Sequence, residues 1–165
     1  MNRKIVIIFT FVSSIISCSA FAGDDFHYNY LNDKTINYSN KIIACDNSKI
    51  TPKFSDGEIN TLRRIISEHP LLLAYLSVKS YNACLQPERG ELAEVLLSYQ
   101  SLDLPPYTLN LAKSAQELAF TQDYGPIKSY QSLSQNDQKA INAIIALQQP
   151  FHEFEVFESI MGMEP

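Results

Sequence analysis

The stretch Ser55–Leu85, SDGEINTLRRIISEHPLLLAYLSVKSYNACL, decides the fold class because it shows where one helix starts, where it stops and where the next begins. Ser55 and Glu58 form a capping box, in which each side chain can bond the backbone N–H of the other residue. Apolar residues then recur at intervals of three and four until Pro70, which ends a helix and is also suited to open one. We therefore predict two consecutive helices, the second running roughly over residues 71–85.

The helix predicted over residues 71–85 carries apolar residues around most of its circumference, a pattern typical of a helix at the centre of a fold. Amphipathic segments broken by proline and glycine continue to the end of the chain, around residues 92–99, 111–119, 134–148 and 151–161. No run of alternating β-branched residues follows Thr51. The expected fold class is all-α, a compact bundle or orthogonal array of about six short helices.

Residues 23–53 show a less regular pattern than the segment that follows. Phe26–Leu31 alternates in the manner of a β-strand. A second set of residues lies at helical spacing: Tyr38, Ile42 and Cys45. We predict an irregular, extended arm followed by a short helix over residues 39–46, packed as one domain with the helical domain of residues 54–165.

Tyr28 and Tyr30 in the predicted arm are candidates for contact with a partner, because tyrosine presents a large apolar body with a polar tip. The alternative is that both rings cover the core of their own domain. The pattern itself does not distinguish the two interpretations.

The final predicted helix combines an aromatic stripe with an acidic outer side. Phenylalanine recurs every three residues and methionine follows four residues later, at Phe151, Phe154, Phe157 and Met161. The favoured interpretation is that this stripe docks on the core of the domain, and the alternative is that it is offered to a partner's groove. The acidic candidates for partner contact are Glu153, Glu155 and Glu158.

Residues 1–22 have the three zones of a secretory signal peptide: the charged start Asn2–Lys4, an apolar run and a few small residues. The apolar run, Ile5–Ile16, is twelve residues long, short of the roughly 20 that span a bilayer. No later stretch reaches that length, so we expect a cleaved leader and no membrane span in the mature chain.

The end of the predicted leader can be processed in two ways. The small-x-small stretch Ala20-Phe21-Ala22 favours cleavage after Ala22 and a free protein in the bacterial periplasm. The alternative is a lipid anchor at Cys18, since Ile15–Cys18 is an acceptable lipobox. The two outcomes differ in whether the domain is tethered to a membrane.

Both outcomes leave Cys45 and Cys84 as a pair, and an even cysteine count in an oxidising compartment predicts one disulfide. Two buried free thiols are the alternative. A metal site is not expected at these cysteines, because there is no CxxC pair and neither cysteine has a histidine within four residues.

The chain has 13 Lys and Arg against 18 Asp and Glu, a net charge of −5. The leader contains Arg3 and Lys4 but no acidic residue, so its removal leaves 11 basic residues against 18 acidic ones, a net charge of −7. Nucleic acid and anionic lipid both require a positive face, so neither is expected as a partner. A cationic protein partner is compatible with this charge. The alternative is an acidic surface that serves solubility alone.

No catalytic or metal-binding pattern stands out in the sequence. The histidines His27, His69 and His152 are widely separated, no G-x-S-x-G elbow is present, and the glycines are isolated from one another. We therefore expect no metal, no cofactor and no enzymatic activity.

These features favour a small exported periplasmic protein that binds another protein. The leading hypothesis is an inhibitor or immunity protein directed against an enzyme or toxin that attacks the cell envelope. Such enzymes are often basic, and the acidic charge would speed the encounter. The first alternative is an accessory factor for envelope assembly or secretion, with or without a lipid anchor at Cys18. A peptidoglycan hydrolase is the less favoured alternative.

Overall fold

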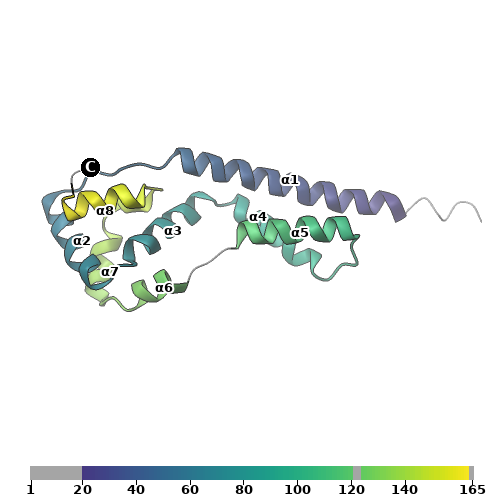
Figure 1. Cartoon of the computed structure of the whole chain (residues 1–165). Helices are drawn as coiled ribbons and strands as arrows, with labels where there is room; N and C mark the ends of the chain where they lie inside the picture. The colour runs from purple at the N-terminus through teal and green to yellow at the C-terminus, as the bar shows by residue number, and fades with distance from the viewer. Residues whose placement is uncertain (1–19, 121–123, 164–165) are drawn as a thin grey trace, which may run out of the picture.

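The computed structural model describes residues 20–120 and 124–163, and these form eight α-helices and one short 3-10 helix without a β-strand. The predicted all-α fold class is confirmed. Of the leader predicted over residues 1–22, residues 1–19 lie outside the described part of the chain, and with them Cys18. The molecule is elongated, with two lobes that follow one another along its long axis (Figure 1).

Lobe A is a three-helix bundle of the long helix α1 (Ala20–Asn47), α4 (Glu88–Tyr99) and α5 (Pro106–Ala119), which lie side by side (Figure 1). All three helices contribute to its core. The helices contribute these hydrophobic core residues: Leu31, Tyr38 and Cys45 from α1, Leu92, Val95, Leu96 and Tyr99 from α4, and Ala115 and Ala119 from α5.

Lobe B contains the remaining described helices: α2 (Asp56–Glu68), α3 (Leu72–Cys84), α6 (Tyr124–Gln131), α7 (Gln135–Asn142), the 3-10 helix η1 (Ile145–Gln148) and α8 (Glu153–Met161). Helix α3 contacts α6, η1 and α8, so the helix with the broadest apolar circumference occupies the middle of this lobe. The core consists of Leu62, Ile65, Ile66, Leu72, Leu73, Leu76, Leu133, Ile141, Ile144, Leu147, Phe151, Val156 and Ile160.

The chain passes between the lobes three times, because α1 belongs to lobe A, α2 and α3 to lobe B, α4 and α5 to lobe A, and α6 onward to lobe B. The Cys45–Cys84 disulfide joins the first two passages, which confirms the predicted pairing. The first passage also meets the segment before α8 in an isolated parallel bridge. There Ile50 N donates to Pro150 O at 3.0 Å and His152 N donates to Ile50 O at 3.0 Å.

Helix α2 begins in the way that its capping box predicts. Ser55 N donates to Glu58 Oε2 at 2.8 Å, and Glu58 N donates to Ser55 Oγ at 3.4 Å. The predicted break at Pro70 is also confirmed, since α2 ends at Glu68 and α3 begins at Leu72. Local signals in the sequence therefore place this helix pair correctly.

The prediction of an irregular, extended arm before residue 39 is wrong, because residues 20–47 form one continuous helix. Leu31, Tyr38 and Cys45 recur every seven residues, about two helical turns, and so face the lobe A core together. Two hydroxyl residues of α1, Thr35 and Ser39, fit this helix because each hydroxyl donates to a carbonyl within it. Thr35 Oγ1 donates to Leu31 O at 2.8 Å, in the i−4 pattern that helices tolerate. The short helix predicted over residues 39–46 is the C-terminal part of α1.

The prediction of one compact bundle or orthogonal array of about six helices also differs from the structure. Eight α-helices are distributed over two lobes, and each lobe has its own core. The single helix predicted over residues 134–148 is divided into α7 and η1. The lobe B core receives Ile141 from α7, Ile144 from the extended residue before η1, and Leu147 from η1 itself, whereas Ile145 is 73% exposed.

Candidate binding surfaces

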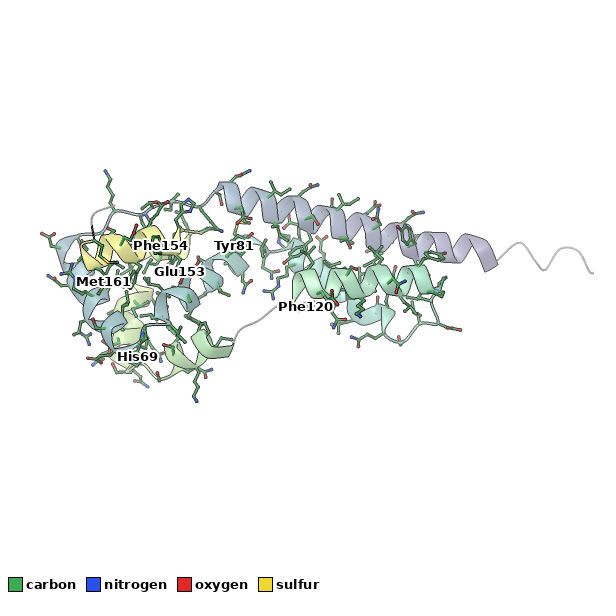
Figure 2. The ribbon with its side chains drawn as sticks, viewed as in Figure 1. His69, Tyr81, Phe120, Glu153, Phe154 and Met161 are labelled. Atoms are coloured by element: carbon green, nitrogen blue, oxygen red, sulfur yellow. A yellow bond between two sulfur atoms is a disulfide. The ribbon has the colours of Figure 1, made fainter. Side chains whose placement is uncertain are left out.

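Helix α8 turns one of its phenylalanines to solvent. Val156 and Ile160 form the buried side of the helix, and Phe154 lies about 160° around the axis from Val156 at 100° per residue. Phe154 is accordingly 70% exposed, and Met161, which lies on the same side, is also exposed (Figure 2). The predicted docking of the stripe on the core is therefore correct for Phe151 and in part for Phe157, and wrong for Phe154 and Met161.

The glutamates of α8 surround this exposed ring. Glu153 and Glu155 are exposed and Glu158 is half-buried. Glu155 Oε2 accepts a hydrogen bond from Thr51 Oγ1, and among the described residues none of the three carboxylates is in an ion pair. The outward face of α8, defined here as Phe154, Met161 and the three glutamates, is thus an apolar patch bordered by unneutralised negative charge. Such a face is complementary to a cationic surface with an apolar centre.

Helix α8 is held firmly against lobe B, so this face is presented by a rigid element. Arg63 of α2 donates to Ile160 O from Nε at 2.9 Å and from Nη2 at 2.6 Å. These charge-assisted bonds satisfy a carbonyl in the last turn of α8 that has no partner within the helix. The Ile50 bridge fixes the chain just before the helix starts.

The two predicted tyrosine contacts lie elsewhere, in the N-terminal half of α1 and far from α8 along the molecule (Figure 1). Tyr28 is half-buried and packs edge-to-face against Tyr107, with ring centroids 5.5 Å apart. Tyr30 is exposed and stacks on Phe26 at 5.9 Å. The structure therefore does not bring the tyrosine and glutamate candidates together into one surface, and Tyr28 mainly covers its own lobe.

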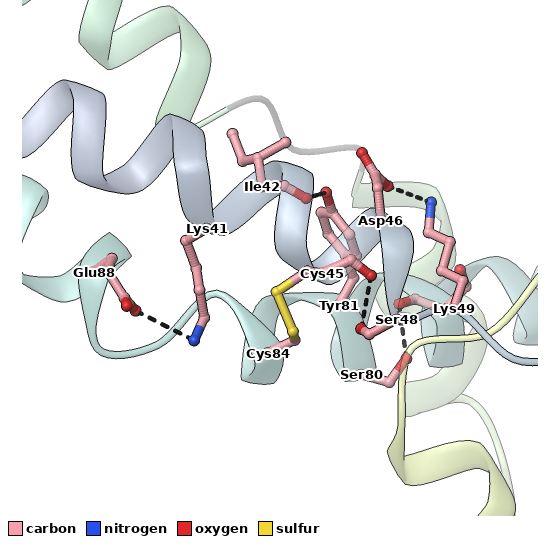
Figure 3. Close-up of a disulfide and its surroundings, with 11 residues drawn as sticks. Lys41, Ile42, Cys45, Asp46, Ser48, Lys49, Ser80, Tyr81, Cys84 and Glu88 are labelled. Atoms are coloured by element: carbon pink, nitrogen blue, oxygen red, sulfur yellow. Dashed lines mark hydrogen bonds and ion pairs between the residues drawn. A yellow bond between two sulfur atoms is a disulfide. The ribbon is translucent and has the colours of Figure 1, made fainter.

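The disulfide lies at the boundary of the two lobes and is surrounded by polar contacts (Figure 3). Tyr81, on α3, donates its hydroxyl to Ile42 O at 3.3 Å, and the Lys49 ammonium lies 5.0 Å from the centroid of its ring. Lys49 also pairs with Asp46 at 2.7 Å. Burial and, secondarily, the nearby Asp46 carboxylate raise the pKa of Tyr81 to about 12.

This raised pKa predicts a loss of stability in alkaline solution. The unfolded chain releases the Tyr81 proton near the ordinary pKa of about 10, before the folded chain does. The stability that neutral Tyr81 contributes is therefore complete below about pH 10 and is lost as the pH rises towards about 12. Urea unfolding at a series of pH values is expected to show this loss, and Tyr81→Phe is expected to reduce it. An identical alkaline slope in the variant would contradict the assignment.

Comparison with known proteins finds no family model, no curated protein and no solved structure that matches this chain. Its function must therefore be inferred from its own residues.

Neither a metal-binding cluster nor a membrane-spanning helix is found among the described residues. No three of the described His, Cys, Asp and Glu side chains are arranged to hold a metal ion. His27 lies in lobe A, while His69 and His152 lie in or beside lobe B helices. None of the described helices combines the length and apolar character that a membrane-spanning segment requires.

Proposed function

We propose that this chain is an exported periplasmic protein that binds a cationic protein through the outward face of α8. In this proposal it acts as an inhibitor or immunity protein against an enzyme or toxin that attacks the cell envelope. The observation that supports it most is Phe154, a phenyl ring 70% exposed among carboxylates that have no cationic partner in the described residues.

This arrangement resembles the energetic centre of a protein interface. Interfaces are commonly organised around an aromatic side chain that becomes fully desolvated, surrounded by polar groups that exclude water. Phe154 would supply the aromatic centre and the glutamates its border. Because α8 is fixed by Arg63 and by the Ile50 bridge, little conformational entropy would be lost on binding.

The charge of the whole chain supports the same partner class. A net charge of −5, or −7 after removal of the leader, attracts a basic protein over distances of about a Debye length and increases the association rate. The α8 face would then determine where the partner docks, and the net charge of the chain would increase the rate of association.

The test uses the exported protein and a panel of purified basic lysozymes and peptidoglycan amidases. The intact mass of the protein is measured first, to show whether it starts at Gly23 or at a lipid-modified Cys18. The expected result is inhibition of at least one enzyme, with a dissociation constant that weakens about 30-fold in Phe154→Ala, the loss of about 2 kcal/mol typical of a hot spot. Phe26→Ala, which removes a ring that is 61% exposed on lobe A, is the matched control and is expected to bind normally.

The role of charge is tested by two triple variants with the same change in net charge. Glu153→Gln, Glu155→Gln and Glu158→Gln together are expected to slow association and to reduce its salt dependence. Asp33→Asn, Glu94→Gln and Asp103→Asn together remove three exposed carboxylates at the lobe A end and are expected to have a smaller effect. Equal effects of both triple variants, or inhibition of no enzyme in the panel, would overturn the proposal.

A further inference from the structure

A pocket of about 350 Å³ opens into lobe B between α3, α7 and η1. Its walls include four side chains of the lobe B core, Leu76, Ile141, Ile144 and Leu147. The pocket therefore reaches side chains of the packed, apolar core. Its volume is at the lower end of the range of about 300–1,000 Å³ that small-molecule sites occupy.

The mouth of this pocket carries one positive charge. Lys79 is exposed at the rim, where its Nζ donates to Asn142 Oδ1 at 3.2 Å. An ammonium group has three N–H donors, so two remain after this bond. Among the described residues no carboxylate pairs with Lys79, although acidic residues outnumber basic ones in the chain. An unneutralised cation at the entrance of an apolar pocket is complementary to an anionic group attached to an apolar body.

Hydrogen bonds hold the rim in place. Asn142 Nδ2 donates to the Tyr130 hydroxyl at 2.9 Å, and Gln148 Nε2 donates to Asn142 O at 3.1 Å. Lys79 also lies over the Tyr130 ring, with its Nζ 5.7 Å from the centroid. These contacts orient Asn142 and through it Lys79, so that a ligand meets a preformed polar group beside a preformed apolar cavity.

We propose that this pocket binds a small amphiphile made of an unbranched aliphatic chain with a single terminal carboxylate. The chain would lie against Leu76, Ile141, Ile144 and Leu147, and the carboxylate would accept hydrogen bonds from the free donors of Lys79. A single ammonium group matches a monoanion, whereas a phosphate or sulfate headgroup would need more donors than this rim offers. The pocket and the α8 face use different residues, so this proposal does not depend on the proposed function.

Isothermal titration of the full exported protein with sodium butyrate, hexanoate, octanoate and decanoate tests the apolar part of the proposal. The expected result is an affinity that increases about fourfold with each added methylene until the pocket is full, because each buried methylene contributes about 0.8 kcal/mol. Ala83→Trp, at the exposed rim, is expected to block all four ligands. Methyl NMR should place the bound octanoate beside Ile141 and Ile144. Affinity that does not change with chain length would overturn the proposal.

The proposed contact between Lys79 and the ligand carboxylate is tested with three ligands of equal chain length: octanoate, 1-octanol and octylammonium. Octanoate is expected to bind about tenfold more tightly than 1-octanol, in line with a charge-assisted hydrogen bond at an exposed site. Lys79→Gln is expected to bring octanoate to the level of 1-octanol and to leave 1-octanol unchanged, a pattern that a loss of folding would not produce. Lys53→Gln, which changes an exposed lysine just before α2, is the control. Equal binding of octylammonium and octanoate would contradict the assignment of Lys79.

Discussion

Replacing Cys45 and Cys84 together by alanine is expected to lower the free energy of unfolding by about 4 kcal/mol. The disulfide joins residues 39 positions apart, and closing a loop of this size removes conformational entropy from the unfolded chain by about that amount. It also connects two passages between the lobes, so the reduced chain has only non-covalent contacts to hold α1 against the end of α3.

Urea unfolding of the oxidised protein and of the Cys45→Ala, Cys84→Ala variant, followed by far-UV circular dichroism, measures this change. Reducing agent serves as the control, because it should destabilise the natural protein and leave the double variant unaffected. Cys45 is fully buried in the lobe A core, so a small additional loss from the missing sulfur is expected. A change below about 1 kcal/mol would show that the bond constrains the unfolded chain much less than loop closure predicts.

Signals that act within one helical turn were sufficient to predict part of this fold. The capping box at Ser55 and the break at Pro70 each depend on backbone hydrogen bonds between close neighbours in sequence. The disulfide could be predicted from the cysteine count alone, because only one pair remains once Cys18 is assigned to the leader. These predictions needed no knowledge of which helices contact each other.

Helix α1 could not be recognised in this way, because its two sides differ little in hydrophobicity. Ile36 and Ile43 are exposed on the outer side, while the inner side buries one residue in every seven, including Leu31 and Tyr38. What makes the inner side a buried surface is contact with α4 and α5, which lie more than 40 residues later in the chain. The division into two lobes has the same origin, since each lobe combines segments that are distant in sequence.

The candidate binding surfaces, too, could be predicted only in part from the sequence. The glutamates of α8 could be selected from the sequence, but the exposure of Phe154 depends on which side of α8 packs against lobe B. The pocket at Lys79 is formed by α3, α7 and η1 together, and no motif connects Leu76 with Ile144.

Phe151→Ala is expected to lower the free energy of unfolding by about 4 kcal/mol, whereas Phe154→Ala should change it by less than about 0.5 kcal/mol. Phe151 is 1% exposed and lies in the lobe B core, between the two residues that bond Ile50. Its removal leaves a cavity that the neighbouring helices cannot fill without moving. Phe154 makes no comparable contact with the core. Urea unfolding of both variants measures the difference, and an equal loss in the two would contradict the orientation of α8.

A repeat of three residues made these phenylalanines look equivalent, but a helix turns about 100° per residue, so each step of three moves the side chain about 60° around the axis. Phe151 is not even helical, because α8 begins after His152. Phe151 and, in part, Phe157 reach the core, and Phe154 between them remains in solvent. If Phe154→Ala keeps full stability and loses binding, then folding and recognition are assigned to different rings of the same stripe. Loss of both stability and binding in Phe154→Ala would show that Phe154 packs in the core. The ring would then not be available as the apolar centre of the α8 face.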